Sequence, residues 1–407
     1  MREVLRDRNV RTILAATLLL GVGYGISIAL TALHLDAHHF GKEDIGSLAA
    51  WFAGGIVAFS IPAGHIVRRF SPKWTLVASL AGYATVVTLF PHLTSFTAIA
   101  AARVLDGVFS VGVWVGSETA LLARADAKRK AFVMSLYAVA MAVGYVAGPI
   151  LARGLAAVLP WTYAFGIAGA LALGAAVVCA VSLEPGLVHG DDESATQTAS
   201  TPMVPALALL RRIRASCFAT FAYGYFQAST VLFLPLFLIE DKGIARDRTI
   251  LVPAFFAAGM LLCTNVAGRI GDAFGHLLSM RVLGTIGGMT VLGFVFLDAY
   301  SAMATAIFIA GATLACISPL SLALQGLVLE PRELSRANGI YNAFYAAGML
   351  LGPRISSYIF AAYGGKAMLF HISALWGLFV IFSIAWRADD PRHHGARERV
   401  SAEGSQA

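Results

Sequence analysis

Two stretches of this sequence repeat one pattern: "YAVAMAVGYVAGPI" at residues 137–150 and "YNAFYAAGMLLGPRI" at residues 341–355. Each begins with Tyr, continues with mostly apolar residues and reaches Gly-x-x-x-Gly-Pro. The repeated residues are Tyr137, Gly144, Gly148 and Pro149, and then Tyr341, Gly348, Gly352 and Pro353. The offset of 204 residues is about half of the 407-residue chain, so the sequence predicts two halves of common origin.

The composition predicts a protein that lies in a lipid bilayer. The chain is 58% hydrophobic and 13% charged, with a mean hydropathy of +0.74, whereas soluble domains are about 45–50% apolar and about 25% charged. The net charge is +7, but Lys and Arg lie in short segments between apolar runs and form no continuous basic face. No nucleic-acid partner is therefore expected.

The four cysteines fall inside apolar runs, and no Cys-x-x-Cys pair occurs. This arrangement favours neither a disulfide framework nor a zinc site. The basic N-terminal segment leads into an apolar run that is long enough to span a membrane and has no clear cleavage site, so no signal peptide is expected. We predict no metal and no cofactor.

Apolar segments long enough to cross a bilayer, about 20 residues each, recur along the whole chain. They predict an all-α membrane protein of twelve transmembrane helices in two six-helix halves. The predicted spans are 11–34, 46–67, 73–92, 96–119, 132–157, 160–183, 215–239, 249–269, 276–297, 302–327, 337–361 and 366–386.

One long polar interval, "EPGLVHGDDESATQTAST" (184–201), separates six spans from six. The segment "MVPALALLRRIR" after it has the composition of a short amphipathic helix on the membrane surface. The predicted domains are a first bundle (1–183), a cytoplasmic linker with that helix (184–214), a second bundle (215–388) and a cytoplasmic tail (389–407).

Loop charge predicts the orientation. Lys and Arg gather in loops on the side of the membrane where the N terminus lies, such as "VRRFSPK" (67–73) and "RADAKRK" (124–130). The loops "PHLTS" (91–95) and "DAYS" (298–301), on the opposite side of the membrane, have no Lys or Arg. Positively charged loops stay in the cytoplasm. Both termini are therefore expected in the cytoplasm, with the protein in the inner (plasma) membrane.

A second pattern recurs at the same offset. "GHIVRRFSPK" begins at Gly64 and "GRIGDAFGHL" begins at Gly268, again 204 residues apart, each at the inner end of the second span of its half. Two halves of six spans share one orientation, which predicts a parallel repeat about an axis normal to the membrane.

These residues resemble the major facilitator superfamily of secondary transporters, over nearly the whole chain. The family's loop after the second span reads G-x-L-A-D-R-x-G-R-R. Gly268 and Asp272 match it in the second half, and Gly64 and Arg69 match it in the first, where Arg68 stands in place of the usual Asp. "RVLDG" (103–107) and Gly-x-x-x-Gly-Pro also match, the latter being typical of antiporters. "GSETALL" (116–122) resembles the YcaD-like, drug-efflux-like bacterial branch.

The resemblance implies alternating access, with one half rocking against the other, and a monomer. It also implies that the loops at Gly64 and Gly268 latch an inner gate, in which Glu118 is a partner for Arg69 or Lys73. Solvated loops are the alternative. The Gly-Pro motifs are interpreted as hinges and seals or, alternatively, as sites of close helix packing, since Gly lets helices approach and Pro bends them.

Three charged side chains inside or at the end of spans are candidate functional residues. Arg103 and Asp106 lie three residues apart, hence on one helical face, and either pair structurally or form a proton site. Glu118 is a second candidate for proton coupling. Charges persist inside a membrane when they pair or act in transport, because each costs at least about 2.5–3.5 kcal/mol there.

Arg354 in the eleventh span has three interpretations: it binds an anionic substrate, pairs with an acid on another helix, or contacts lipid. The resemblance also implies which spans line the substrate cavity. Their aromatic and weakly polar side chains suit a small amphipathic organic solute, although any one of them also fits simple packing. The cavity candidates besides Arg354 are Tyr24, Trp114, Tyr223, Gln227, Asn342 and Tyr345.

The sequence therefore favours a secondary active transporter that moves a small organic solute, by proton-coupled export (antiport). The alternative is proton-coupled uptake (symport) of an organic anion. A membrane receptor or intramembrane enzyme is the remote alternative. No P-loop, HExxH or GxSxG motif occurs, and no pair of histidines at helical spacing is expected within a span. The chain is therefore not expected to be an enzyme.

Overall fold

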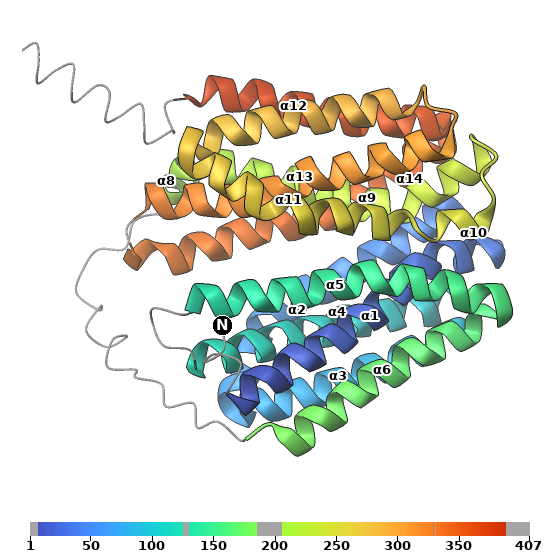
Figure 1. Ribbon diagram of the computed structural model, residues 1–407, viewed down its shortest axis with the longest axis vertical. Helices are drawn as coiled ribbons and strands as arrows, with labels where there is room; N and C mark the ends of the chain where they lie inside the picture. Colours follow the sequence, from blue (N-terminus) through green and yellow to red (C-terminus); the bar gives the residue numbers. More distant parts are fainter. Residues whose placement is uncertain (1–6, 125–129, 185–205, 330, 388–407) are drawn as a thin grey trace, which may run out of the picture. The chain divides into compact units, whose positions relative to one another are not determined.

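The computed structural model describes residues 7–124, 130–184, 206–329 and 331–387, and these form helices with no strand among them (Figure 1). The first half contains α1 (Arg8–Ala37), α2 (Lys42–Phe70), α3 (Pro72–Leu89), the 3₁₀ turn η2 (Phe90–His92), α4 (Phe96–Arg124), α5 (Lys130–Val158) and α6 (Trp161–Ser182). The second half contains α8 (Ala206–Arg212), α9 (Arg214–Glu240), α10 (Arg246–Thr249), α11 (Val252–Phe274), α12 (His276–Phe294), α13 (Tyr300–Val328) and α14 (Pro331–Ala385).

The predicted spans are all helical. Ten helices of the described residues are long and apolar enough to cross a membrane. One of them, α14, carries the last two predicted spans, which meet at Gly364 with φ of 84°, a backbone conformation that glycine adopts readily. The 29-residue helix α2 supplies the remaining span. The twelve-helix, all-α fold is therefore confirmed.

A short helix, α8, lies in the segment predicted to form an amphipathic helix, whose place on the membrane surface stays a prediction. Leu209 of α8 and the adjacent Ile213 are buried in one cluster with Cys217, Leu329 and Ala337. This apolar contact anchors the start of the second half to α9, to the end of α13 and to α14. The rest of the predicted linker (185–205) and the tail from residue 388 on lie outside the described residues.

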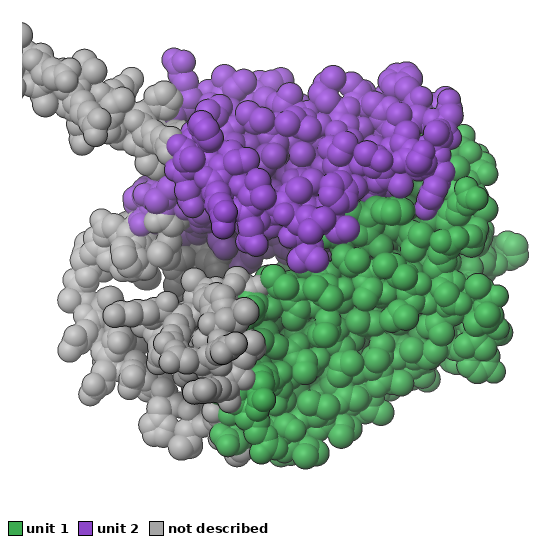
Figure 2. Space-filling view, viewed as in Figure 1, with its two compact units in different colours: residues 1–201, 231–257 green, residues 202–230, 258–407 purple. Residues whose placement is uncertain are grey.

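The helices form two compact units, coloured separately in Figure 2. The first comprises the described parts of 1–201 together with 231–257, and the second comprises those of 202–230 and 258–407. Residues 231–257 thus belong to the second half by sequence but pack with the first half. The domain boundaries drawn from the repeat stay predictions.

Glycines bring α1 and α5 into close contact in the first unit. Gly144 of α5 lies against Gly21 of α1, and a Cβ on Gly148 would lie only 2.5 Å from the Cα of Gly25. Close approach of backbones replaces the hydrophobic effect as the source of helix association in lipid. The packing interpretation of the Gly-Pro motif is thereby supported, while its action as a hinge stays a prediction.

The second unit repeats this contact between α9 and α14. Gly348 lies against the backbone carbonyl of Phe221, and a Cβ on Gly352 would lie 2.6 Å from the carbonyl oxygen of Tyr225. Residues 21 and 225 are 204 positions apart, as are 144 and 348. The repeat therefore extends from the sequence motif to the backbone contacts that the motif makes.

A further repeated contact joins the second and fourth spans of each half. Gly55 of α2 lies against the carbonyl of Val104 in α4, and Gly259 of α11 lies against the carbonyl of Phe308 in α13. Gly55 and Gly259 are 204 residues apart, and so are Val104 and Phe308. The two halves thus share a scaffold of glycine-mediated contacts, on which their polar residues differ.

Candidate functional site

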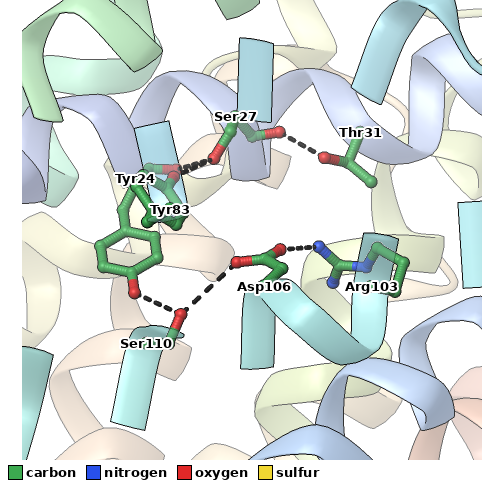
Figure 3. A network of polar contacts seen from close by, with 7 residues as sticks. All are labelled: Tyr24, Ser27, Thr31, Tyr83, Arg103, Asp106 and Ser110. Atoms are coloured by element: carbon green, nitrogen blue, oxygen red, sulfur yellow. Dashed lines mark hydrogen bonds and ion pairs between the residues drawn. The ribbon is translucent and has the colours of Figure 1, made fainter. Parts of the chain in front are cut away.

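A network of polar side chains from α1, α3 and α4 lies within the first unit (Figure 3). Arg103, Asp106 and Ser110 belong to α4. Their spacings of three and four residues place them on one face of the helix. The other members are Tyr83 of α3 and Tyr24, Ser27 and Thr31 of α1. Both α1 and α3 contact α4.

Both oxygens of the Asp106 carboxylate accept hydrogen bonds. The Arg103 guanidinium donates to Oδ2 in an ion pair, and the Ser110 hydroxyl donates to Oδ1 at 3.4 Å. The side chains of Arg103 and Asp106 are 16% and 13% exposed. The pair is therefore sheltered but not sealed off, and the predicted structural pairing of these residues is observed.

Arg103 has a second contact that holds it in place. Its guanidinium carbon lies 4.5 Å from the centre of the Phe52 ring of α2. The face of an aromatic ring attracts a cation and replaces part of its hydration. Arg103 is therefore fixed between a carboxylate on its own helix and a ring on a neighbouring helix.

The network reaches α1 through Tyr24, whose hydroxyl donates to Ser110. The rings of Tyr24 and Tyr83 are 4.6 Å apart, and the Tyr83 hydroxyl lies 3.1 Å from the Ser27 hydroxyl. Thr31 donates to the backbone carbonyl of Ser27 at 2.7 Å. Asp106 is thus connected to α1 by two hydrogen bonds in series.

Tyr24, Arg103 and Asp106 are among the candidates that the sequence predicts, whereas Ser110 and Tyr83 are not. Ser110 lies one turn after Asp106, so helical spacing was a usable signal for it. Tyr83 lies on a different helix, and only the packing of α3 against α4 brings it near the network.

Trp114 and Glu118 continue the same stripe of α4 at four-residue steps. Trp114 is half-buried, whereas Glu118 is exposed and lies near Tyr137 of α5. Glu118 is thus on the same helix as Asp106 but outside the network of Figure 3. Its part in proton coupling stays a prediction.

The two cations expected to pair with Glu118 contact aromatic rings. Arg69 lies 5.6 Å from the ring centre of Phe70, and Lys73 lies 5.4 Å from that of Trp74. A latch between either cation and Glu118 stays a prediction. Gly64 and Arg68 belong to the last turns of α2, and their part in a latch stays a prediction as well.

The corresponding loop of the second half contains an acid–histidine contact. Asp272 Oδ1 lies 3.4 Å from Nε2 of His276, one turn further along the chain. Gly268 lies one turn before Asp272, near the inner end of α11. The role of this loop as a latch stays a prediction.

Three predicted cavity residues come together in the second unit. The rings of Tyr223 in α9 and Tyr345 in α14 are stacked with centres 6.0 Å apart, and the Tyr345 hydroxyl donates to Gln227 Oε1 at 2.8 Å. Asn342 lies on an exposed part of α14. Binding of a small amphipathic solute by these residues stays a prediction.

A second polar cluster, around His371, was not predicted. The imidazole Nε2 lies 3.0 Å from the Tyr225 hydroxyl and 3.3 Å from the Ser356 hydroxyl, and Ser356 donates to Ser229 at 2.9 Å. These contacts join α9 to both parts of α14. A lone histidine within the apolar run 366–386 was the available signal.

Arg354 is exposed on α14. The large apolar residues around it on the same helix, Leu351, Ile355 and Tyr358, are exposed as well. An exposed arginine among exposed apolar residues agrees with the lipid-contact interpretation. In that interpretation the long side chain extends toward the membrane surface. Binding of an anion and pairing with an acid stay alternatives.

Two histidines lie one turn apart at the end of the first span, not within it. Helix α1 extends to Ala37, three residues beyond the predicted end of the span, so His34 and the capping residue His38 lie one turn apart. Their ring centres are 4.2 Å from each other, and His38 Nδ1 lies 2.8 Å from the carbonyl oxygen of His34.

The polar networks of the two halves are different, although their scaffolds match. The positions 204 residues after Tyr24, Arg103, Asp106 and Ser110 hold Ala228, Ile307, Ala310 and Leu314. The positions 204 residues before Tyr225, Ser229, Ser356 and His371 hold Gly21, Gly25, Ala152 and Ile167. Each half has therefore acquired its own chemistry on a common frame.

Comparisons with known proteins agree with this architecture. The family described as the Major Facilitator Superfamily matches residues 13–301 and 216–405. The uncharacterized MFS-type transporter YcaD of Escherichia coli (strain UMN026) is 23% identical over 396 residues, which cover 95% of this chain and 97% of the relative.

Solved structures share the fold at low sequence identity. A bacterial homologue of the human lysosomal transporter Spinster, in an inward-facing and occupied conformation, has a TM-score of 0.76 at 12% identity and covers 92% of this chain and 95% of that one. The nucleoside transporter NupG has a TM-score of 0.74 at 12% identity, with coverage of 92% and 97%. This chain therefore belongs to the Major Facilitator Superfamily and is a multi-pass membrane transporter, not an enzyme.

Proposed function

We propose that this transporter exports a small amphipathic organic solute in exchange for protons. The observation that carries the proposal is the Asp106 carboxylate, which lies inside a membrane span and is held by Arg103 and Ser110. A carboxylate is a group that can take up and release a proton as access alternates. The equivalent position of the second half is Ala310, so this chemistry belongs to the first half.

Protonation of Asp106 changes the network in a defined way. The neutral acid no longer balances Arg103, and an uncompensated cation within a span costs at least about 2.5–3.5 kcal/mol. The hydrogen bond from Ser110 also weakens, because it loses a charged acceptor. Ser110 accepts a hydrogen bond from Tyr24 of α1. A change in the protonation state of Asp106 is therefore transmitted from α4 to α1.

The type of solute and the direction of transport rest on separate features. The stacked pair Tyr223 and Tyr345, with Gln227 at its edge, supports an amphipathic solute. Export is supported by Gly144, Gly148 and Pro149, which resemble the motif of antiporters. Proton-coupled uptake of an organic anion through Arg354 is the alternative, and the direction of proton-driven flux distinguishes the two.

The test is transport by purified protein in liposomes. Solutes are first selected by thermal shift from amphipathic acids, amines and sugars, because a ligand that binds only the folded state stabilises it. We expect Asp106→Asn to abolish flux driven by a pH gradient and to keep exchange of solute across the membrane. The matched control is Asp44→Asn, at an exposed acid of α2. Uphill flux that persists in Asp106→Asn would exclude Asp106 as the coupling site.

A further inference from the structure

Residues 231–257 pack with the first half of the chain, although by sequence they belong to the second. This segment contains the last part of α9, the short helix α10 and the first residues of α11. It meets the first half where α1 ends, α2 begins and α5 ends. These three helix termini lie at the same face of the membrane, because successive spans run in opposite directions.

Three of the ion pairs among the described residues join this segment to the first half. Each pairs one residue of the segment with a residue at the end of a different first-half helix. The pairs are Glu240 with Lys42 of α2 at 2.8 Å, Arg246 with Asp36 of α1 at 2.7 Å, and Asp247 with Arg153 of α5 at 3.3 Å.

Arg246 makes further contacts with the first half. Besides Asp36, its guanidinium donates to the carbonyl oxygen of Leu33 at 3.2 Å and lies 5.9 Å from the ring centre of Trp161, at the start of α6. The C-terminal end of α1 also attracts a cation through the helix dipole. One side chain thus joins the segment to two helices of the first half.

We propose that these three ion pairs form a clasp, centred on Arg246, that holds this face of the transporter closed. Alternating access requires the two sequence halves to part at each face in turn. To open this face, residues 231–257 must leave α1, α2 and α5, so all three pairs must break. The strength of the clasp then sets how much of the protein is open at this face.

The exposure of the pairs suits a contact that forms and breaks in every cycle. The side chains of Arg246 and Asp36 are 36% and 30% exposed, and those of Arg153 and Asp247 are 44% and 58% exposed. Ion pairs that water reaches are weak and are screened by salt. Three of them together, with the ring of Trp161, provide a reversible closure.

The clasp is tested by the accessibility of a residue beneath it. Thr249 is fully buried and Ala254 is 6% exposed, so a cysteine at either position reports opening. Each reporter is placed in a protein whose four native cysteines are replaced, and is labelled with a maleimide in nanodiscs, where both membrane faces are open to the reagent.

We expect Arg246→Gln and Asp36→Asn to speed labelling at both reporters about fivefold, the ratio that corresponds to loss of one exposed pair of about 1 kcal/mol. The exchange Asp36→Arg with Arg246→Asp should restore slow labelling. The control Asp44→Asn, at an exposed acid of the same face, should leave labelling unchanged.

Unchanged labelling in both single variants would overturn the clasp. Faster labelling at Thr249→Cys alone would also overturn it, since only α10 would then have frayed. If the Arg246 variants do not fold, Lys42→Gln breaks an independent pair and is expected to speed labelling at both reporters. These results do not depend on Asp106 or on the transported solute.

Discussion

Asp106 shows how much of a site depends on immediate neighbours in the sequence. Its ion-pair partner Arg103 and its hydrogen-bond donor Ser110 are within one turn of the same helix. Helical spacing was therefore sufficient to predict the pair. Phe52 and Tyr83 complete the surroundings of this group from α2 and α3, and no spacing within α4 indicates them.

Arg354 provides a test at a single residue. Its side chain is exposed among the apolar residues Leu351, Ile355 and Tyr358. We therefore expect Arg354→Gln to have only a small effect on solute affinity, of the same size for acidic and for neutral solutes. Thermal shift of the purified variant against both classes measures this. A selective loss of acidic ligands would instead assign Arg354 to an anion site and favour uptake of an organic anion.

At the scale of the helix, the Gly-x-x-x-Gly-Pro motif is explained by contact between pairs of helices. Gly148 and Gly352 occupy equivalent positions in α5 and α14, and each lies against the backbone of its partner helix, α1 or α9. The sequence predicted close packing but did not identify the partner. The partner depends on which helices become neighbours in the bundle.

Alanine substitutions of glycines in α5 are expected to distinguish the effect of helix packing on stability from the effect of helix propensity. Gly148→Ala would place a Cβ 2.5 Å from Gly25, whereas Gly154 of the same helix has nothing within 4 Å of its added Cβ. Gly148→Ala should therefore lose about 1–3 kcal/mol of stability through overpacking. Gly154→Ala should be neutral or stabilising, since Ala favours a helix more than Gly by about 1 kcal/mol.

Thermal unfolding of the purified variants in one detergent measures this difference. Gly352→Ala is the second-half counterpart, with a Cβ 2.6 Å from Tyr225, and should also lower the unfolding temperature. Equal unfolding temperatures for Gly148→Ala and Gly154→Ala would show that α1 and α5 move apart at little cost.

At the scale of the whole molecule, a single offset of 204 residues relates the spans, the loop motifs and the glycine contacts of the two halves. The polar residues do not follow this offset. Arg103 and Asp106 occur only in the first half at this position, and His371 with Tyr225 only in the second. Duplication of the scaffold with divergence of its polar residues is consistent with one half acting in coupling and the other in binding.

The orientation of the molecule is a separate prediction from loop charge. We expect the C terminus to lie in the cytoplasm, because positively charged loops stay on that side. A green fluorescent protein fused at the C terminus should therefore be fluorescent, and alkaline phosphatase fused after Leu93, in the loop without Lys or Arg, should be active. The clasp, at the end of α1, is then expected on the side opposite the cytoplasm. Phosphatase activity from the C-terminal position would reverse both assignments.

The twelve spans, the two related halves and the Arg103–Asp106 pair followed from the sequence, because hydropathy, repetition and helical spacing are properties of residues close together in the chain. The partners of α4 in the network, the cluster around His371 and the attachment of residues 231–257 to the first half followed only from the tertiary structure. Their members are up to 213 residues apart. Such contacts depend on which helices pack together, which local composition does not specify.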